Sequence, residues 1–287
     1  MTSLRVFRPA TMGALRAVMH DPGPVHPIAG GTDMLVAGRL LPDQGVLVDL
    51  SGLRELQGID AHGIDIRIGP ATTAAAIEAD IELASRYPAL VQAAAECGSV
   101  QIRNRATIGG NIANAAAAAD LIPPLLLAGA RIAGLLLGGE AREVSLCDYV
   151  PNAGLLITSI ILPGDGFGPV SAFVKLGPRH DLTIARLNLA ATAWRAEDRL
   201  VGLRIMAGAL APRPIALHRA AKALDGQTLS SDTLCAFLDA LSAEVDTTIA
   251  GRGSQAWKRQ AIRGVGIDLI ARLLALDCRS PLFDEVW

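Results

Sequence analysis

Two glycine-containing segments, far apart in the chain, could each bring bare backbone amides close to a ligand. The first follows a short apolar run and consists of Ile28, Ala29, Gly30, Gly31, Thr32, Asp33 and Met34. The second consists of Thr107, Ile108, Gly109, Gly110 and Asn111. Consecutive N–H groups without covering side chains form concavities that bind phosphate oxygens. Neither segment has the G-x-G-x-x-G spacing of a Rossmann site, and either one alone could be an ordinary turn.

Two charged residues stand next to apolar sequence and could serve a bound ligand. Asp120 ends an alanine run and could accept hydrogen bonds from ligand hydroxyls, or could simply cap the helix that follows. Lys175 is a lone cation in the apolar run 173–177. Lysines in strands usually lie on a solvated face, whereas a partly buried lysine beside a redox ring would stabilise its anionic reduced form.

The cysteines and histidines of the chain predict no local metal site and no catalytic nucleophile. The cysteines are widely spaced, without a C-x-x-C pair, at Cys97, Cys147, Cys235 and Cys278. The five histidines are equally scattered. Iron–sulfur and zinc sites are usually built from closely spaced ligands. We therefore assign no catalytic and no metal-binding residue to this chain.

Composition places the chain among globular proteins and leaves room for assembly with partner chains. Its 287 residues suffice for two domains, and its hydrophobic content of 51% against 19% charged residues favours apolar surface buried against other chains. A net charge of -2 and only 3% aromatic residues argue against nucleic-acid binding. Neither a signal peptide nor a membrane-spanning stretch is visible, so we expect a cytoplasmic protein.

The local patterns predict an α+β protein in which the order of helices and strands changes near residue 165. In the first part we expect helices at 11–19, 72–82, 88–96 and 120–128, and strands at 27–29, 46–50, 64–68 and 155–162. The run 106–119 is expected to be a glycine-rich loop. The turn signal 163–166 separates a domain at 1–165 from one at 166–287. There we expect strands at 170–176, 187–196 and 200–210, the last two forming a hairpin, and helices at 218–224, 230–245 and 255–276.

Five segments of the chain, in this order, resemble the signatures of the FAD-binding medium subunit of molybdenum hydroxylases. This is the family of xanthine dehydrogenase and carbon monoxide dehydrogenase. The segments lie at 29–33, 101–111, 118–121, 173–177 and 208–214. The second of them, Q-I-R-N-R-A-T-I-G-G-N, is the most specific. The resemblance extends over nearly the whole chain, although Ala116 and Ala117 stand where the family usually has Ser-Pro.

The resemblance implies a fold, a cofactor and a set of binding residues. The fold is the two-subdomain FAD-binding fold of vanillyl-alcohol oxidase, followed by a smaller α+β domain with a three-stranded antiparallel sheet. Two glycine-rich loops would cradle the diphosphate of FAD, here 28–34 and the loop containing Thr107, Gly109, Gly110 and Asn111. Four further residues would lie near the cofactor hydroxyls or the flavin ring: Cys97, Asp120, Ile157 and Lys175.

The resemblance also implies a role in electron transfer. A large partner chain would oxidise the substrate at a molybdenum cofactor, and a small chain with [2Fe-2S] clusters would carry electrons to the FAD of this chain. The acceptor would be NAD, dioxygen or a quinone, and the assembly a dimer of heterotrimers. Two alternatives remain open: a self-contained FAD oxidase or reductase, and a scaffold subunit that has lost FAD, for which the alanines at 116 and 117 give a reason.

Overall fold

The computed structural model describes residues 4–36, 41–164, 170–179, 182–277, 280–283 and 286. The chain forms two compact units. Unit 1 contains residues 1–77, 99–115 and 129–164, and unit 2 contains residues 78–98, 116–128 and 165–287. The chain therefore passes repeatedly from one unit to the other before residue 165. The domain boundary at residue 165 stays a prediction, and Asp165 and Gly166 of its turn lie outside the described residues.

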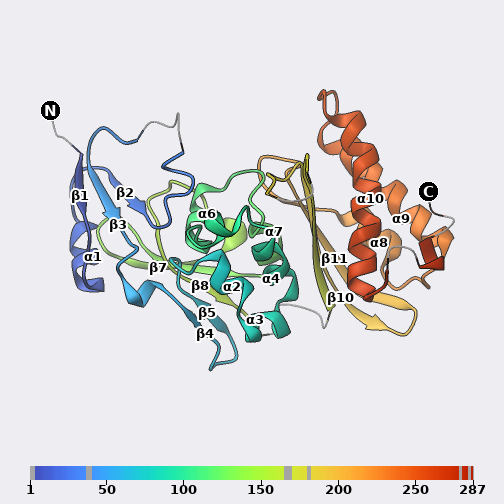
Figure 1. Ribbon diagram of the computed structural model, residues 1–287, viewed down its shortest axis with the longest axis horizontal. Coiled ribbons are helices and arrows are strands. Elements are labelled where there is room, and N and C mark those ends of the chain that lie inside the picture. The colour runs from blue at the N-terminus through green and yellow to red at the C-terminus, as the bar shows by residue number, and fades with distance from the viewer. Residues whose placement is uncertain are drawn as a thin grey trace. The chain divides into compact units, whose positions relative to one another are not determined.

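Unit 1 begins with a small parallel sheet. Its strand order is β1–β3–β2, with β1 at Arg5–Phe7, β2 at Val25–Ile28 and β3 at Val46–Asp49 (Figure 1). Helix α1 (Met12–Val18) connects β1 to β2, and the Thr11 hydroxyl accepts the N–H of Ala14, as the predicted cap requires. Strand β1 escapes prediction because all three of its residues are exposed, so they show no alternation.

A five-stranded antiparallel sheet forms the rest of the β-structure of unit 1. Its order is β4–β5–β8–β6–β7. The strands lie at Ile59–Asp60, Ile66–Ile68, Leu156–Leu162, Arg131–Leu135 and Ala141–Ser145, in that order. The predicted strands near residues 66 and 156 are confirmed. Strands β6 and β7 were not predicted, because β7 carries charged side chains on both faces and β6 contains Gly134.

Short helices connect strands in the described part of unit 1. They are α2 (Ala74–Glu78), whose last residue belongs to unit 2, α5 (Val100–Arg103), α6 (Ile108–Asn114), and the 3-10 turns η1 (Arg54–Leu56) and η2 (Leu146–Asp148). The prediction of a loop at 106–119 is thus wrong for α6. Thr107 caps this helix, and Ile108 and Ile112, one turn apart, are both buried. Capping and burial outweigh the low helix propensity of two glycines.

Unit 2 is built around a four-stranded antiparallel sheet of order β12–β11–β10–β9. Strands β9 (Val170–Leu176), β10 (Leu187–Ala196) and β11 (Arg199–Gly208) were predicted, and the hairpin at Glu197 is confirmed. The prediction of three strands missed β12 (Ile215–Ala216), which is too short to show any periodicity.

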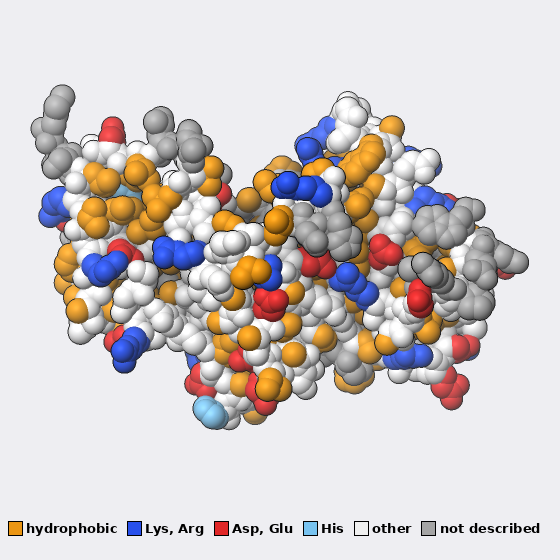
Figure 2. Space-filling model, viewed as in Figure 1, with side chains coloured by type: hydrophobic (Ala, Val, Ile, Leu, Met, Phe, Trp, Pro, Cys, Tyr) orange, Lys and Arg blue, Asp and Glu red, His pale blue; other side chains and the backbone are white. Residues whose placement is uncertain are grey.

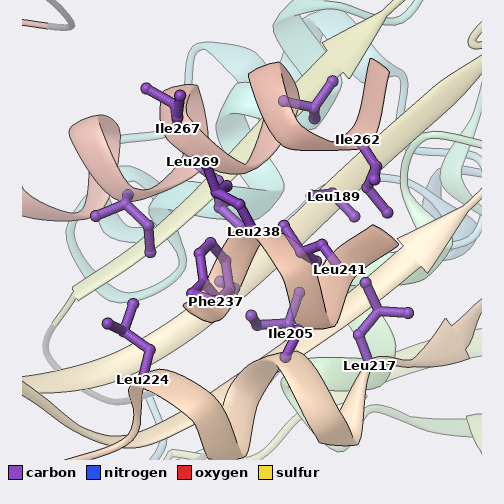
Figure 3. Packing of buried hydrophobic residues seen from close by; sticks show 14 of the residues in the cluster. Leu189, Ile205, Leu217, Leu224, Phe237, Leu238, Leu241, Ile262, Ile267 and Leu269 are labelled. Carbon is purple, nitrogen blue, oxygen red and sulfur yellow. The ribbon is translucent and has the colours of Figure 1, made fainter. Parts of the chain in front are cut away.

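Helices cover both faces of this sheet within unit 2 (Figure 1). Helices α8 (His218–Leu224), α9 (Ser231–Thr248) and α10 (Gln255–Leu274) lie on one side, and α4 (Pro88–Ala95) and α7 (Ile122–Leu127) on the other. Leu189 of β10 and Ile205 of β11 join Phe237 and Leu241 of α9 in one core cluster (Figure 3). Residues of alternate parity, such as Asn188 and Thr192, therefore point to the opposite face of the sheet.

The remaining helices of unit 2 show where local signals succeed and where they fail. The expected helix at 72–82 breaks near Asp80, which caps a separate helix α3 (Ile81–Arg86). Pro123 and Pro124 occupy the first turn of α7 as expected, but the N-cap is Leu121 and no side chain caps this helix. A final 3-10 turn, η3, lies at Pro281–Phe283.

Candidate cofactor-binding site

A cleft of about 460 Å³ in unit 1 brings the two glycine-containing segments together. Every residue from Ile28 to Met34 lines it, and Thr107, Gly110 and Asn111 face it from the other segment. The remaining lining residues are Val25, His26, Pro27, Pro42, Ala106, Ala113, Asn114 and Asn152. The two segments lie more than seventy residues apart in the chain, yet both line the same cleft.

The turn at 28–34 offers backbone donors to this cleft. In the described part of the chain, the N–H groups of Gly30, Gly31, Thr32 and Met34 donate to no other residue. Gly31 has a φ of 71°, a left-handed conformation that glycine adopts without strain. Successive unpaired amides of this kind form a concave site for an anion.

The second segment behaves differently, because its amides are already used inside unit 1. The N–H of Ile108 donates to the Thr72 carbonyl at 3.0 Å, and that of Gly109 to the Pro70 carbonyl at 2.9 Å. Those of Gly110 and Asn111 both donate to Thr107, at its hydroxyl and its carbonyl. Each of these four amides thus already has an acceptor within unit 1.

Side chains of the second segment remain free to serve a ligand. The Thr107 hydroxyl accepts a hydrogen bond from Gly110 at 3.2 Å and keeps its own hydrogen to donate. The buried Oδ1 of Asn111, which lies beside the cleft, has no partner among the described residues. Such an orphaned buried atom is costly unless something else satisfies it. Unpaired amides, a hydroxyl and a primary amide around one cleft fit a phosphate-bearing cofactor.

Three of the four glycines in these segments lack room for a side chain for different reasons. A Cβ at Gly30 would lie 1.8 Å from the Arg105 carbonyl oxygen, and one at Gly109 would lie 2.5 Å from Pro70. These two glycines therefore allow backbones to approach one another. A Cβ at Gly110 would meet only the Thr107 hydroxyl, at 3.0 Å. Gly110 is thus the glycine whose missing side chain keeps the cleft itself open.

A smaller apolar cavity of about 90 Å³ adjoins this cleft within unit 1. The two share the lining residues Pro27, Ala29, Gly110 and Ala113. Ile157 of β8, which is buried, forms part of the wall of the smaller cavity together with Gly109. The structure thus places Ile157 close to the glycine segments, as an apolar neighbour.

In unit 2, Asp120 and Lys175 form a buried ion pair. The Lys175 ammonium donates to Asp120 Oδ2 at 2.6 Å and to the Glu96 carbonyl at 2.8 Å. Their side chains are only 7% and 3% exposed. The other carboxylate oxygen of Asp120, Oδ1, accepts a hydrogen bond from Asn188 Nδ2 at 3.0 Å. Lys175 is therefore not on a solvated face, and Asp120 is not a helix cap.

Burial governs the ionisation of this pair. Loss of solvent raises the pKa of Asp120 to about 6, and the positive charge of Lys175 and the hydrogen bond from Asn188 limit that rise. Cys97 lies directly after Glu96 and is half-buried, and it forms no disulfide with another described cysteine. Cys97, Asp120 and Lys175 all belong to unit 2, whereas the other predicted site residues belong to unit 1.

Sequence reasoning missed several residues of both groups. Asn188 is the clearest, because an amide inside the apolar run 187–193 is a visible signal for a buried hydrogen bond. Glu96 takes part through its backbone carbonyl, which no side-chain pattern can reveal. His26 and Asn152 line the cleft from positions without any local signal.

The fold and the cleft define an FAD-binding oxidoreductase subunit, and comparison with known proteins gives the family. A family model described as "FAD binding domain in molybdopterin dehydrogenase" matches residues 2–165, and one described as "CO dehydrogenase flavoprotein C-terminal domain" matches residues 172–272. The chain belongs to this family of FAD-binding subunits of molybdopterin dehydrogenases. FAD is therefore its cofactor, as the sequence motifs predicted.

Particular relatives agree with this assignment. The nicotinate dehydrogenase FAD-subunit of Eubacterium barkeri is 28% identical over 96% of this chain and 97% of its own length. The carbon monoxide dehydrogenase medium chain of Afipia carboxidovorans is 30% identical over 72% of this chain and 74% of its own. A chain of the crystal structure of Cu,Mo-CO dehydrogenase superposes with a TM-score of 0.81 at 26% identity, covering 96% of this chain and 99% of that one.

Proposed function

We propose that this chain is the electron-transfer subunit of a molybdenum hydroxylase complex. It receives electrons from a small [2Fe-2S] chain, after a large chain has oxidised the substrate at a molybdenum cofactor, and delivers them to NAD, dioxygen or a quinone. Bound FAD supplies the redox centre for this transfer. The observation that carries the proposal is the cleft of unit 1, where unpaired amides of the 28–34 turn face the side chains of Thr107 and Asn111.

Each part of the cleft has a distinct task in this proposal. The amides of Gly30, Gly31 and Thr32 hold the diphosphate of FAD, because they are the unpaired donors and lie in succession. Thr107 and Asn111 add side-chain hydrogen bonds. Asp33 and Met34 complete the turn, and Ile157 supplies an apolar wall against which an uncharged part of the cofactor packs.

In unit 2, we propose that Lys175 lies beside the flavin ring, with Cys97 nearby. An ammonium group has three hydrogens, and two of those on Lys175 are donated to Glu96 and Asp120. One hydrogen remains for the ring, and the positive charge stabilises an anionic form. Asp120 acts on the cofactor through Lys175, since both of its oxygens already accept hydrogen bonds inside unit 2.

We also propose that the chain assembles with its partner chains as a dimer of heterotrimers in the cytoplasm. Exposed apolar surface supports contact with partner chains, though not a particular stoichiometry. Figure 2 shows hydrophobic side chains over β1 and β2, and the exposed large apolar residues of the chain include Val6, Ile64, Ile81, Ile184 and Trp194. In the described part of the chain, no helix combines the length and the hydropathy that a bilayer crossing demands.

Replacing Gly110 by valine tests the cofactor site. The new side chain would fill the cleft where only the Thr107 hydroxyl is near, so we expect loss of bound FAD with the fold retained. Flavin absorbance of the purified chain and titration with FAD measure this loss. Gly52→Val is the matched control in unit 1, because a Cβ there meets only Arg8 at 3.6 Å. Stoichiometric FAD in the Gly110→Val protein would contradict this site.

The isolated holo-chain distinguishes the proposed role from its alternatives. An electron-transfer subunit should not reduce its flavin with small organic substrates unless the partner chains are present, whereas a self-contained oxidase should. A scaffold that has lost FAD would stay colourless when FAD is supplied. Copurification of a molybdenum chain and an iron–sulfur chain is the expected result for the intact complex.

A further inference from the structure

Asn188 is a buried amide at the centre of the unit 2 sheet. In the strand register it lies opposite Lys175 of β9 on one side and Gly208 of β11 on the other. It is fully buried and points away from the core cluster that contains its neighbours Leu187 and Leu189. Asn188 therefore belongs to the same side-chain layer as Lys175.

The orientation of the Asn188 amide is fixed by what each end meets. Its Nδ2 donates to Asp120 Oδ1 at 3.0 Å, whereas its Oδ1 has no partner among the described residues. An ionised carboxylate only accepts hydrogen bonds, so it requires the NH2 end of the amide. The unsatisfied oxygen lies against Gly208, where a Cβ would come within 2.2 Å of it. Gly208 thus leaves room for the orientation that serves Asp120.

The segment next to Gly208 also holds the chain that carries Asp120. The N–H of Ala209 donates to the Ala117 carbonyl at 2.7 Å, and the Ala209 carbonyl accepts from the Lys258 ammonium. Ala209 has a φ of 58°, an uncommon conformation for alanine that these two bonds maintain. Gly208 thus lies opposite Asn188, and Ala209 bonds the backbone at Ala117, three residues before Asp120.

The charged groups around Asp120 come from three elements of unit 2. Lys175 of β9 is its ion-pair partner, and Glu96, which follows α4, lies near enough for its negative charge to raise the pKa of Asp120. Arg272 of α10 pairs with Glu96 at 3.1 Å and also donates to the Phe173 carbonyl. With a pKa of about 6, Asp120 lies close to the point where loss of one donor changes its charge at neutral pH.

We propose that Asn188, with the space left by Gly208, is a positioning residue that keeps Asp120 ionised and turned toward Lys175. The position of the Lys175 ammonium group is thereby fixed, so its third hydrogen points in a single direction. The positioning itself concerns only contacts within unit 2. Its consequence for FAD rests on the proposed function, in which Lys175 lies beside the flavin.

The first experiment measures the titration of Asp120 without reference to FAD. Full-length protein with ¹³C-labelled aspartate is titrated by carboxyl NMR, and the Asp120 signal is assigned by its loss in Asp120→Asn. In Asn188→Ala, the midpoint of Asp120 should rise by about one pH unit, because one hydrogen bond to the ionised form is lost. An unchanged midpoint in the folded variant would overturn the proposal.

Two further variants and one control test whether the effect on Asp120 is specific to Asn188. Gly208→Ala should raise the midpoint in the same way, since the new Cβ displaces the amide, and Asn188→Ala/Gly208→Ala should show no additional rise. The matched control is Thr192→Val, which removes a different side-chain hydrogen bond of β10, from the Thr192 hydroxyl to the Val170 carbonyl at 3.2 Å. The hydrogen-bond partners of Asp120 are Lys175 and Asn188. An equal rise in this control would mean that general loosening of the sheet, not Asn188, sets the midpoint, and would refute the proposal.

The second experiment measures the reduction potential of bound FAD against pH. In Asn188→Ala, the pH at which the potential curve bends should move upward together with the midpoint of Asp120. If the carboxyl midpoint moves and the potential curve does not, the positioning role of Asn188 is supported and the proposed place of Lys175 beside the flavin is refuted.

Discussion

The ion pair between Lys175 and Asp120 illustrates how burial changes what single residues do. Both side chains are almost fully removed from solvent, and each is the other's charged partner. Taking such charges out of water costs several kcal/mol, which their attraction offsets only while both are present. The pair therefore specifies the geometry of this part of unit 2 more than it stabilises the fold.

Removing one partner of this pair should be far more damaging than removing both. We expect Lys175→Met to lower the free energy of unfolding by about 3–5 kcal/mol, and Lys175→Met/Asp120→Leu to lower it much less. Urea unfolding monitored by tryptophan fluorescence measures this, because Trp194 and Trp257 both lie in unit 2. A double variant as unstable as the single one would show that the uncompensated charge is not the cause.

The same pair predicts a pH dependence with a definite sign. Burial raises the pKa of Asp120 from 3.8 to about 6, so the folded state binds its proton more tightly than the unfolded state does. Its contribution to stability is complete below pH 3.8 and is lost as the pH rises through about 6. The loss amounts to about 3 kcal/mol, from a shift of roughly two pKa units.

This pH dependence is measured as the difference between the wild type and Lys175→Met/Asp120→Leu. Urea unfolding at a series of pH values between about 4 and 7 should show the wild type losing stability relative to the double variant. A difference that stays constant over this range would mean that Asp120 has an ordinary pKa in the folded protein.

At the scale of elements, the long helix α10 contains two glycines with opposite environments. A Cβ at Gly264 would meet nothing within 4 Å, whereas one at Gly266 would lie 2.4 Å from Leu241 Cδ1 of α9. Gly266 therefore allows α9 and α10 to pack closely, and Gly264 has no such role. Both glycines lie inside α10 and have helical backbone conformations, so they form a matched pair.

Alanine at these two glycines should change stability in opposite directions. Gly264→Ala should stabilise unit 2 by about 0.5–1 kcal/mol, because alanine loses less conformational entropy in a helix. Gly266→Ala should destabilise it by about 1–3 kcal/mol through overpacking against Leu241. Tryptophan-monitored urea unfolding compares them directly, and equal effects of both substitutions would contradict the close packing of α9 on α10.

At the scale of the whole molecule, the chain order and the compact units do not coincide. The two family models divide the chain between residues 165 and 172, yet α4 and α7, which lie within the first model, cover a face of the unit 2 sheet. Side chains on that face, including Phe173 and Asn188, are fully buried. The C-terminal family domain thus depends on helices from the N-terminal sequence.

A fragment of residues 170–287 should therefore not fold as the C-terminal domain does in the full chain. Without α4 and α7, one face of its sheet is bare, so we expect a sloping urea transition and aggregation instead of a cooperative transition. Adding the fragment 1–165 during refolding should restore cooperativity. A monomeric 170–287 fragment that unfolds as sharply as the full chain would show that the boundary near residue 165 is also a boundary of folding.

The sequence by itself determined the features that depend on neighbours along the chain. The strands at 170–176 and 187–196, the helix at 218–224 and the Thr11 cap follow from periodicity and capping, and the family follows from ordered motifs. Even the meeting of the two glycine segments could be expected from the resemblance.

Only the tertiary structure decided which hydrogen-bonding groups are still available. The amides at 108–111 donate to the carbonyls of Pro70, Thr72 and Thr107 and to the Thr107 hydroxyl. Amides of the 28–34 turn, such as those of Gly30 and Gly31, have no such acceptor among the described residues, although both segments contain a glycine pair. Likewise the Lys175 ammonium group pairs with Asp120, which lies 55 residues away in the chain, and does not point into solvent. A donor or acceptor is satisfied by whatever the fold places beside it, and such partners lie too far along the chain for any local pattern to reveal.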